Sequence, residues 1–385
     1  MLHRIQFAPA LLLAGSLLLA ACGGAAAPAS STTASPAAAP SSAAAKPAAS
    51  AAASAKPAAS ASAKPAASGA ASAKPAASGA AAASGAAGSL KVALLTSGPV
   101  NDGGWNQLAY EGLQKMKTDL NLQVANSEDV KESDQLSLMR NYVNQGFNVI
   151  IGHGFEYQKA LEQAAKDNPK TQFVQIGGIG ANGSNLQSYV WVTGEGGWVA
   201  GSLAAATTKN HHIAVVGALD IPTIAGDFAS FQQSVKQYDP QATIDKPIYS
   251  GSFDDIAKGK AAGTTALSSG ADVILANGDA VNIGTVQAAK GKQVRIIGWT
   301  KDQTSLDPAV VEGSYLNRVD KAMEDAVKSI QAGKQDGKSH TVGIKDGDAG
   351  MAFNNALVPA DVQAKVKAVQ DDVASGKIKL PELKS

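Results

Sequence analysis

The segment at residues 96–107 brings several polar groups and one indole together. It reads Thr-Ser-Gly-Pro-Val-Asn-Asp-Gly-Gly-Trp-Asn-Gln, and it begins where a short apolar run ends. A carboxylate and amides offer hydrogen-bond partners, and an indole offers a flat apolar face. This combination suits a planar ligand with a polar edge, such as a nucleobase. The candidate ligand-binding residues here are Ser97, Asn101, Asp102 and Trp105.

Most of these residue types also have purely structural roles. Trp105 could belong to the core beneath the first helix, and Asp102, followed by glycine, could cap that helix. Asn277 and Asp279 follow an apolar run at 271–276, so they could line a pocket or simply form a turn. Phe155, which follows the run at 148–153, has the same two interpretations.

Sequence motifs of catalysis are absent. The stretch 178–183 matches G-x-G-x-x-G, but it leads into an alternating apolar stretch and not into a helix, so we predict a surface turn. The sequence has no G-x-S-x-G, Walker or H-E-x-x-H motif. His211 and His212 would point to opposite faces of a strand, which suits a metal ion poorly. We therefore expect a binding protein and no enzyme, with no cofactor and no metal.

Short apolar runs alternate with amphipathic stretches of helical length from Leu90 onward. The predicted strands are 91–96, 148–153, 172–176, 212–218, 271–276 and 294–299. The predicted helices are 104–119, 132–145, 156–167, 196–208, 228–237, 255–269 and 282–290. Alternation of this kind indicates an α/β fold with parallel sheets and right-handed crossovers. One sheet with so many strands is unusual, so we expect two doubly wound lobes with ligand groups at the carboxyl ends of the strands.

The folded part divides into three segments. Residues 89–210 are predicted to form the first α/β lobe, and residues 211–300 the second. The break is placed near Lys209–His212, where a helical stretch gives way to a new apolar run. Residues 301–385 are predicted to supply crossover segments and C-terminal helices that complete both lobes.

Cys22 is the only cysteine of the chain and ends the sequence Leu19-Ala20-Ala21-Cys22. This arrangement resembles a bacterial lipobox, in which the thiol receives a diacylglyceryl group. We predict a lipoprotein signal peptide at 1–21, lipidation at Cys22, and a lipid-anchored protein on the extracytoplasmic face of the cell membrane. An ordinary secretory signal and a membrane span are the alternatives, although the uncharged stretch at 5–21 is short for a span.

Residues 22–88 are predicted to form a lipidated cysteine followed by a disordered Ala/Ser/Pro/Lys tether. Beyond Cys22 this stretch has no acidic or aromatic residue and nothing apolar larger than alanine or proline, so it has too little apolar surface to offset the entropy of ordering. All 32 acidic residues lie beyond it, against 28 of the 33 basic residues, which gives the folded part a formal charge of −4. This charge predicts no nucleic-acid partner.

The chain resembles the Bmp/PnrA-like (basic membrane protein) family of ABC transporter substrate-binding lipoproteins. The first loop is similar to the family's Val-Asn-Asp-x-x-[Phe/Trp]-Asn-Gln pattern. Further similar stretches follow in the family's order: 195–201, 221–222, 252–254, 270–274 and 298–303. The resemblance implies a type I periplasmic-binding-protein fold with a hinged cleft, a small-molecule ligand such as a purine base or nucleoside, and an ABC permease as partner. It also implies that Trp105 stacks on the base, that Asp102 or Asn101 reads its edge, and that Phe253 stacks on the other side.

The chain departs from the family pattern at three positions. Thr300 stands where an aspartate usually grips the ribose, and Asn317 stands near the place of a lysine. Gly177 stands near the place of another aspartate. A free base or another flat heterocycle without ribose therefore becomes as good an expectation as a nucleoside, and Trp299 could fill the space of the sugar. A ligand sensor that presents its closed state to a membrane receptor is the alternative function.

Overall fold

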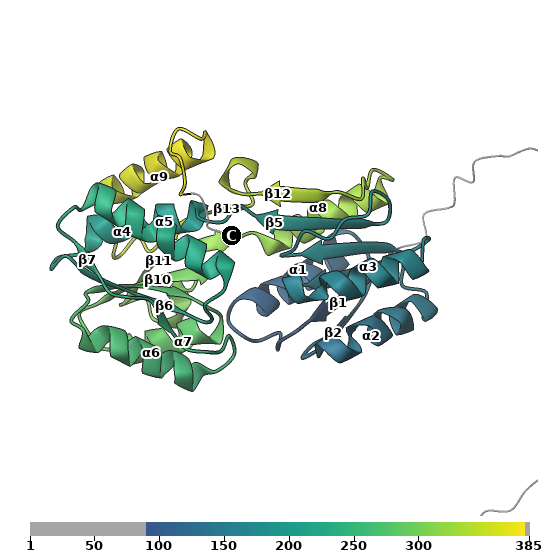
Figure 1. Ribbon diagram of the computed structural model, residues 1–385, viewed down its shortest axis with the longest axis horizontal. Coiled ribbons are helices and arrows are strands. Elements are labelled where there is room, and N and C mark those ends of the chain that lie inside the picture. Colours follow the sequence, from purple (N-terminus) through teal and green to yellow (C-terminus); the bar gives the residue numbers. More distant parts are fainter. Residues whose placement is uncertain (1–89, 382–385) are drawn as a thin grey trace, which may run out of the picture. The chain divides into compact units, whose positions relative to one another are not determined.

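The computed structural model describes residues 90–381, which contain two β-sheets with helices on both faces of each (Figure 1). The first sheet is entirely parallel. Its strands, in spatial order, are β12 (Ser339–Val342), β5 (Leu186–Trp191), β4 (Gln172–Ile176), β3 (Val149–His153), β1 (Lys91–Thr96) and β2 (Gln123–Ser127). The second sheet consists of β13 (Ala349–Phe353), β11 (Val311–Asn317), β10 (Arg295–Thr300), β9 (Val273–Asn277), β6 (His212–Gly217) and β7 (Thr243–Ile244), with β8 (Ile248–Tyr249) also paired to β6. Only β13 runs antiparallel to its neighbour in this sheet.

Burial on both faces explains why the apolar runs become central strands. In β1, Val92 and Leu94 pack against α1 (Trp105–Asp119) and α8 (Val319–Gln331). The alternate residues Ala93 and Leu95 belong to a separate core with α2 (Glu132–Asn144) and α3 (Gln158–Asp167). Since successive side chains of a strand point to opposite faces, a continuous apolar run is what a doubly covered parallel strand requires.

The second sheet is covered in the same way. Its helices are α4 (Glu195–Thr207), α5 (Pro222–Tyr238) and α9 (Ala360–Ala374) on one face and α6 (Ile256–Ser268) and α7 (Ala280–Ala289) on the other (Figure 1). Helices α4 and α5 approach closely because Gly197 and Gly201 face backbone oxygens of Asp227 and Phe231, where a side chain would not fit. The expected fold class, two doubly wound parallel-sheet lobes, is confirmed.

The chain passes between the sheets three times: between β5 and α4, between β11 and α8, and between β12 and β13. The structure places the first crossing at 192–194, earlier than the break predicted near 209–211. The reason is that α4 packs in the core of the second sheet, where Trp198 and Leu203 are buried. The segment after residue 300 contributes strands to both sheets.

Helix α5 begins at Pro222, six positions before the predicted helix at 228–237. Proline at the first helical position needs no hydrogen bond from its nitrogen and has a suitable φ, so the helix starts there. Seven strands are not among the predicted ones: β2, β5, β7, β8, β11, β12 and β13. Helices α8 and α9 correspond to the C-terminal helices expected within 301–385, for which no bounds were predicted. The G-x-G-x-x-G stretch leads into β5 and opens no helix, as predicted. It is a surface segment only in part, because Gly178 and Gly180 are buried whereas Ile179 and residues 181–183 are exposed. In the described part of the chain, no helix has both the length and the apolar character that a membrane crossing requires.

Candidate functional site

The first loop is held in place by Asp102, which is buried with 3% of its surface exposed. Its two carboxylate oxygens accept hydrogen bonds from the backbone N–H groups of Gly104, Asn106 and Gln107 at 2.8–3.0 Å, and from the Asn106 side chain at 2.9 Å. These donors are the otherwise unpaired groups at the start of α1. The structure therefore gives Asp102 the capping role and commits its oxygens to the protein itself.

Trp105 begins α1 and lies at the carboxyl ends of the first sheet. Its indole is partly exposed and stacks on the His153 ring at a centroid distance of 4.2 Å, while the Trp191 ring meets it edge-on at 5.6 Å. His153 ends β3 and Trp191 ends β5. The three rings thus form an aromatic cluster built from one helix and two strand ends.

His153 fixes Trp105 through a hydrogen bond as well. Its Nε2 donates to the Trp105 carbonyl oxygen at 3.0 Å, and the ring is fully buried. Burial lowers the pKa of His153 to about 3, with the Trp105 carbonyl opposing the shift. The imidazole is therefore neutral at neutral pH, and it serves as a flat support and not as an acid or base.

Gly177 makes room for the indole. It follows β4 with a φ of +85°, and a Cβ at this position would lie 2.7 Å from Trp105 Cζ2. A side chain here would strain the backbone and displace the ring. The absence of an aspartate near this position thus has a local physical reason.

Asp279 of the second sheet reaches the same loop. It lies at the start of α7, and its Oδ1 accepts a hydrogen bond from the Trp105 backbone N–H at 2.9 Å. Burial, followed by the charges of Asp102 and Asp254, raises the pKa of Asp279 well above its usual value, and the Trp105 N–H opposes this. Two further contacts join the lobes: Gln303 Nε2 donates to the Gly103 oxygen at 3.2 Å, and Lys301 Nζ lies 3.1 Å from the Glu111 carboxylate. We call this contact region, with the aromatic cluster, the inter-lobe surface.

Asp227 is a polar residue of this surface that the sequence did not single out. It lies in α5, and its Oδ1 accepts a hydrogen bond from Gly194 N–H at 2.8 Å. Burial and the nearby charge of Glu195 raise the pKa of Asp227 to about 7, against the effect of the Gly194 and Gly197 N–H groups and Asn277. The predicted helix began one residue too late to include it. Recognition of Pro222 as a helix start would have placed Asp227 near the carboxyl ends of the strands.

Thr300 and Trp299 end β10 and have different surroundings. Trp299 is buried in the core of the second sheet and packs against Tyr315 at a centroid distance of 5.0 Å. Thr300 is buried with a φ of +74°, a left-handed conformation that costs a β-branched residue on the order of 1–3 kcal/mol. Such strain at a strand end fits a position constrained by function, whereas Trp299 has a clear packing role.

The other predicted residues are more dispersed. Ser97 and Asn101 are exposed in the first loop, and Asn277 is buried at the end of β9. Phe155 is 64% exposed, while Phe253 packs against the core of the second sheet. Within residues 90–381, neither phenylalanine forms an aromatic pair with Trp105. Cys22 lies outside the described residues. Over the same range, no group of three or more acidic, histidine or cysteine side chains is arranged to hold a metal ion.

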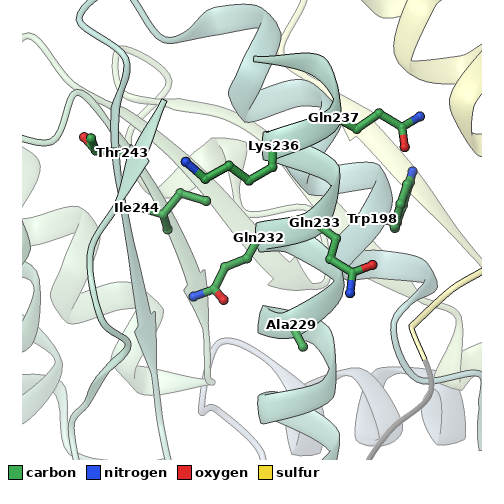
Figure 2. Close-up of a pocket in the computed structure, with 8 residues that line it drawn as sticks. All are labelled: Trp198, Ala229, Gln232, Gln233, Lys236, Gln237, Thr243 and Ile244. Carbon is green, nitrogen blue, oxygen red and sulfur yellow. The ribbon is translucent and has the colours of Figure 1, made fainter. Parts of the chain in front are cut away.

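A depression of about 820 Å³ lies elsewhere, along α5 (Figure 2). It is lined by Trp198, Ala229, Gln232, Gln233, Lys236, Gln237, Thr243 and Ile244. None of these residues is a predicted site residue. The candidate site therefore rests on the strand ends and not on this depression.

Two doubly wound sheets joined by three crossings, with candidate ligand groups at facing strand ends, define a type I periplasmic-binding-protein fold. A solute-binding protein of an ABC transporter system from Conexibacter woesei has a similar structure, with a TM-score of 0.67 and 23% identity over 77% of this chain and 100% of its own. Residues 89–384 match the family described as ABC transporter substrate-binding protein, PnrA-like. The chain belongs to this family, and the resemblance drawn from its motifs is confirmed.

Two relatives illustrate the range of the family. The ABC transporter nucleoside-binding protein BmpA of Lactococcus lactis is 29% identical over 76% of this chain and 89% of its own length. The transcriptional activator protein med of Bacillus subtilis is 28% identical over 72% of this chain and 86% of its own. The chain is thus a substrate-binding protein of the ABC transporter type, with a small-molecule ligand and a permease as the partners that the family implies.

Proposed function

We propose that this protein captures a purine-type nucleobase or nucleoside between its lobes and delivers it to an ABC permease. The observation that carries the proposal is the partly exposed Trp105 indole, supported by His153 and Trp191 at the carboxyl ends of the strands. In open α/β sheets, ligands bind at this edge. Stacking of a base on an aromatic ring contributes roughly 1–3 kcal/mol. The name of the Lactococcus lactis relative as a nucleoside-binding protein supports the same class of ligand.

The sequence departures favour the free base at least as much as the nucleoside. Gly177 offers no carboxylate, because Trp105 occupies the space above it. Thr300 offers a hydroxyl where a carboxylate would grip two ribose hydroxyls. A ligand between the lobes would contact Trp105 of the first lobe and the strand ends of the second. Such a ligand stabilises the closed conformation of the two lobes, because it touches both of them only in that conformation.

The test is a thermal-shift panel on residues 23–385, refolded to remove any ligand that copurifies. The panel contains purine and pyrimidine bases, their nucleosides, amino acids and sugars. A ligand at 100 times its Kd adds about 2.7 kcal/mol to the free energy of unfolding. A shift with purine compounds supports the proposal. If only sugars or amino acids raise the melting temperature, the purine assignment is wrong.

We also propose that Cys22 carries a lipid and that the segment after it tethers the protein outside the cell. The lipobox-like sequence 19–22 and the composition of residues 23–88 support this. Cys22→Ser should move the protein from the membrane fraction to the soluble extracytoplasmic fraction. Continued sedimentation of this variant with membranes would contradict lipidation.

A ligand sensor is the second candidate, and the name of the Bacillus subtilis relative favours it. Transport separates the two functions. Uptake of a bound purine that depends on this protein and on a permease supports capture for import. Ligand-dependent signalling without uptake supports the sensor.

A further inference from the structure

The second lobe presents acidic groups to the inter-lobe surface without matching cations. The acidic side chains are Glu195, Asp227, Asp254 and Asp279, and burial is the largest cause of a raised pKa in each. The neighbouring charges that add to burial are acidic as well: Asp346 for Glu195, Glu195 for Asp227, and Asp102 for both Asp254 and Asp279. Among residues 90–381, no lysine or arginine lies close enough to lower the pKa of any of the four. The site thus offers several carboxyl groups, and no neighbouring cation offsets the cost of burying them.

Three cations at the inter-lobe contacts and the crossings are already paired with other acids. Lys301 lies against Glu111, Arg318 against Asp320, and Lys321 against Asp348. An anionic ligand would therefore meet carboxylates without a free positive partner. An uncharged or cationic ligand needs no positive partner.

Asp227 and Asn277 place an acceptor and a donor side by side. Asn277 is 5% exposed, and its Nδ2 makes no hydrogen bond in the described part of the chain. This amide lies near enough to lower the pKa of Asp227, although the two groups do not meet the geometry of a hydrogen bond. A buried donor without a partner is costly, and a ligand acceptor would satisfy it.

This pair is connected to the aromatic cluster through a short piece of backbone. Asn277 and Asp279 are two residues apart, and Asp279 accepts the Trp105 N–H. Asp227 also binds Gly194, where the chain crosses between the lobes. A carboxylate has about four acceptor positions, so Asp227 keeps capacity for a ligand beyond its backbone partners.

We propose that Asp227 and Asn277 read adjacent donor and acceptor groups on the edge of an uncharged heterocycle stacked on Trp105, and that the acidic surroundings exclude anionic ligands such as nucleotides. This inference rests on the proposed function and specifies its substrate class. Asp227 accepts from a ring or exocyclic N–H of the ligand, and Asn277 donates to the neighbouring ring nitrogen or oxygen.

The experiment is calorimetric titration of residues 23–385 with purine bases, their nucleosides and the matching 5′-monophosphates, together with acidic and basic amino acids. Three variants accompany the wild-type protein. Asp227→Asn removes the charge and keeps the shape, and Asn277→Leu removes the amide. The control is Asp361→Asn, which removes one negative charge from an exposed position of α9. Circular dichroism and melting temperature report whether each variant is folded.

The wild-type protein should bind the uncharged ligand at least about tenfold more tightly than its monophosphate. Asp227→Asn and Asn277→Leu should each weaken the uncharged ligand about tenfold, since each leaves a buried partner unpaired. Asp227→Asn should also reduce the ratio between the affinities for the uncharged ligand and for its monophosphate. Asp361→Asn should change neither the affinity for the uncharged ligand nor this ratio.

The other outcomes separate this inference from the proposed function. Equal affinity for nucleoside and monophosphate overturns charge exclusion but leaves purine binding intact. Unchanged affinities in both variants overturn edge reading. Binding of an uncharged or basic compound that is no purine, weakened by Asp227→Asn, supports this inference and contradicts the purine proposal. Binding of anions alone, or of no compound, contradicts both.

Discussion

At the scale of single residues, the proposed stacking role of Trp105 depends on what surrounds its ring. The sequence left open whether it is a core residue of the first helix. Its partial exposure, the buried neutral His153 beneath one face, and the glycine at 177 show a ring that is supported from its own lobe. These supports could not be read from the sequence, because they come from strand ends 48 and 72 positions away along the chain.

Trp105→Ala should reduce ligand affinity at least about tenfold, because it removes a stacking contribution of roughly 1–3 kcal/mol. Calorimetric titration measures the change, and circular dichroism reports on the fold. The matched control is Trp198→Phe, since Trp198 is buried in the core of the second sheet away from the cluster. Wild-type affinity in Trp105→Ala would remove the stacking role.

Glu312 shows a different kind of residue effect, on stability. It is fully buried in β11, and Thr207 donates to its Oε1 at 2.9 Å. Burial raises the pKa of Glu312 from 4.5 to about 8. The folded protein therefore retains a proton that the unfolded chain loses as the pH rises above about 4.5. The free energy of unfolding must then fall with rising pH in the interval from 4.5 to 8.

Glu312→Gln should flatten this part of the stability profile and raise the free energy of unfolding at pH 8 by about 1–3 kcal/mol. The amide oxygen of glutamine can still accept from Thr207. Urea unfolding at pH 5 and pH 8 measures the effect, and Glu132→Gln, on the exposed side of α2, is the control. Equal pH dependence in the Glu312 variant and the wild type would show that Glu312 is ionised in the folded protein.

At the scale of elements, the sequence predicted the central strands well because their burial on both faces produces continuous apolar runs. Predictions failed where the pattern is short or mixed. Strand β12 carries Ser339, His340 and Thr341, and it is a strand because it pairs with β5. The start of α5 was missed because the first helical residues, 222–227, have little amphipathic pattern. Asp227 lies in this first part of α5 and was missed for the same reason.

Asp102 links element formation to the site. Asp102→Ala removes the acceptor of three backbone N–H groups at the start of α1, and it should lower the free energy of unfolding by about 2 kcal/mol. Ligand affinity should fall with it, because Trp105 begins this helix. Denaturant unfolding and titration measure the two effects. Lys117→Ala, on the exposed side of the same helix, should change neither. Loss of binding with unchanged stability would instead assign Asp102 to the ligand.

At the scale of the whole molecule, the crossings tie the lobes together through a few buried groups. Glu195 accepts from Ile344 N–H at 2.9 Å, which joins the first crossing to the third. The Asp348 carbonyl oxygen accepts from Trp191 Nε1 and from Arg318 N–H, each at 2.8 Å, which joins the third crossing to β5 and to the start of α8. None of these contacts has a local sequence signal, since the partners are 30 to 157 positions apart. The family resemblance implied a hinge, but only the structure identifies its contacts.

Closure of the lobes should respond to the charge of Asp279. In the observed conformation this carboxylate accepts the Trp105 N–H, while the charges of Asp102 and Asp254 oppose its ionisation. Asp279→Asn keeps an acceptor oxygen and removes the repulsion, so the ligand-free protein should become more compact. Asp279→Ala removes the acceptor as well, so the balance should shift toward the open form.

Small-angle scattering or energy transfer between dyes on the two lobes measures this shift. The apparent affinity of a ligand that binds the closed form rises with the fraction of the protein that is closed. Ligand affinity should therefore rise in Asp279→Asn and fall in Asp279→Ala. Acidification should compact the wild-type protein but not Asp279→Asn, because protonation removes the same charge. If both variants open the protein equally, the prediction is wrong. The negative charge of Asp279 would then stabilise the closed conformation through its interaction with the start of α1, and this interaction would exceed the repulsion from Asp102.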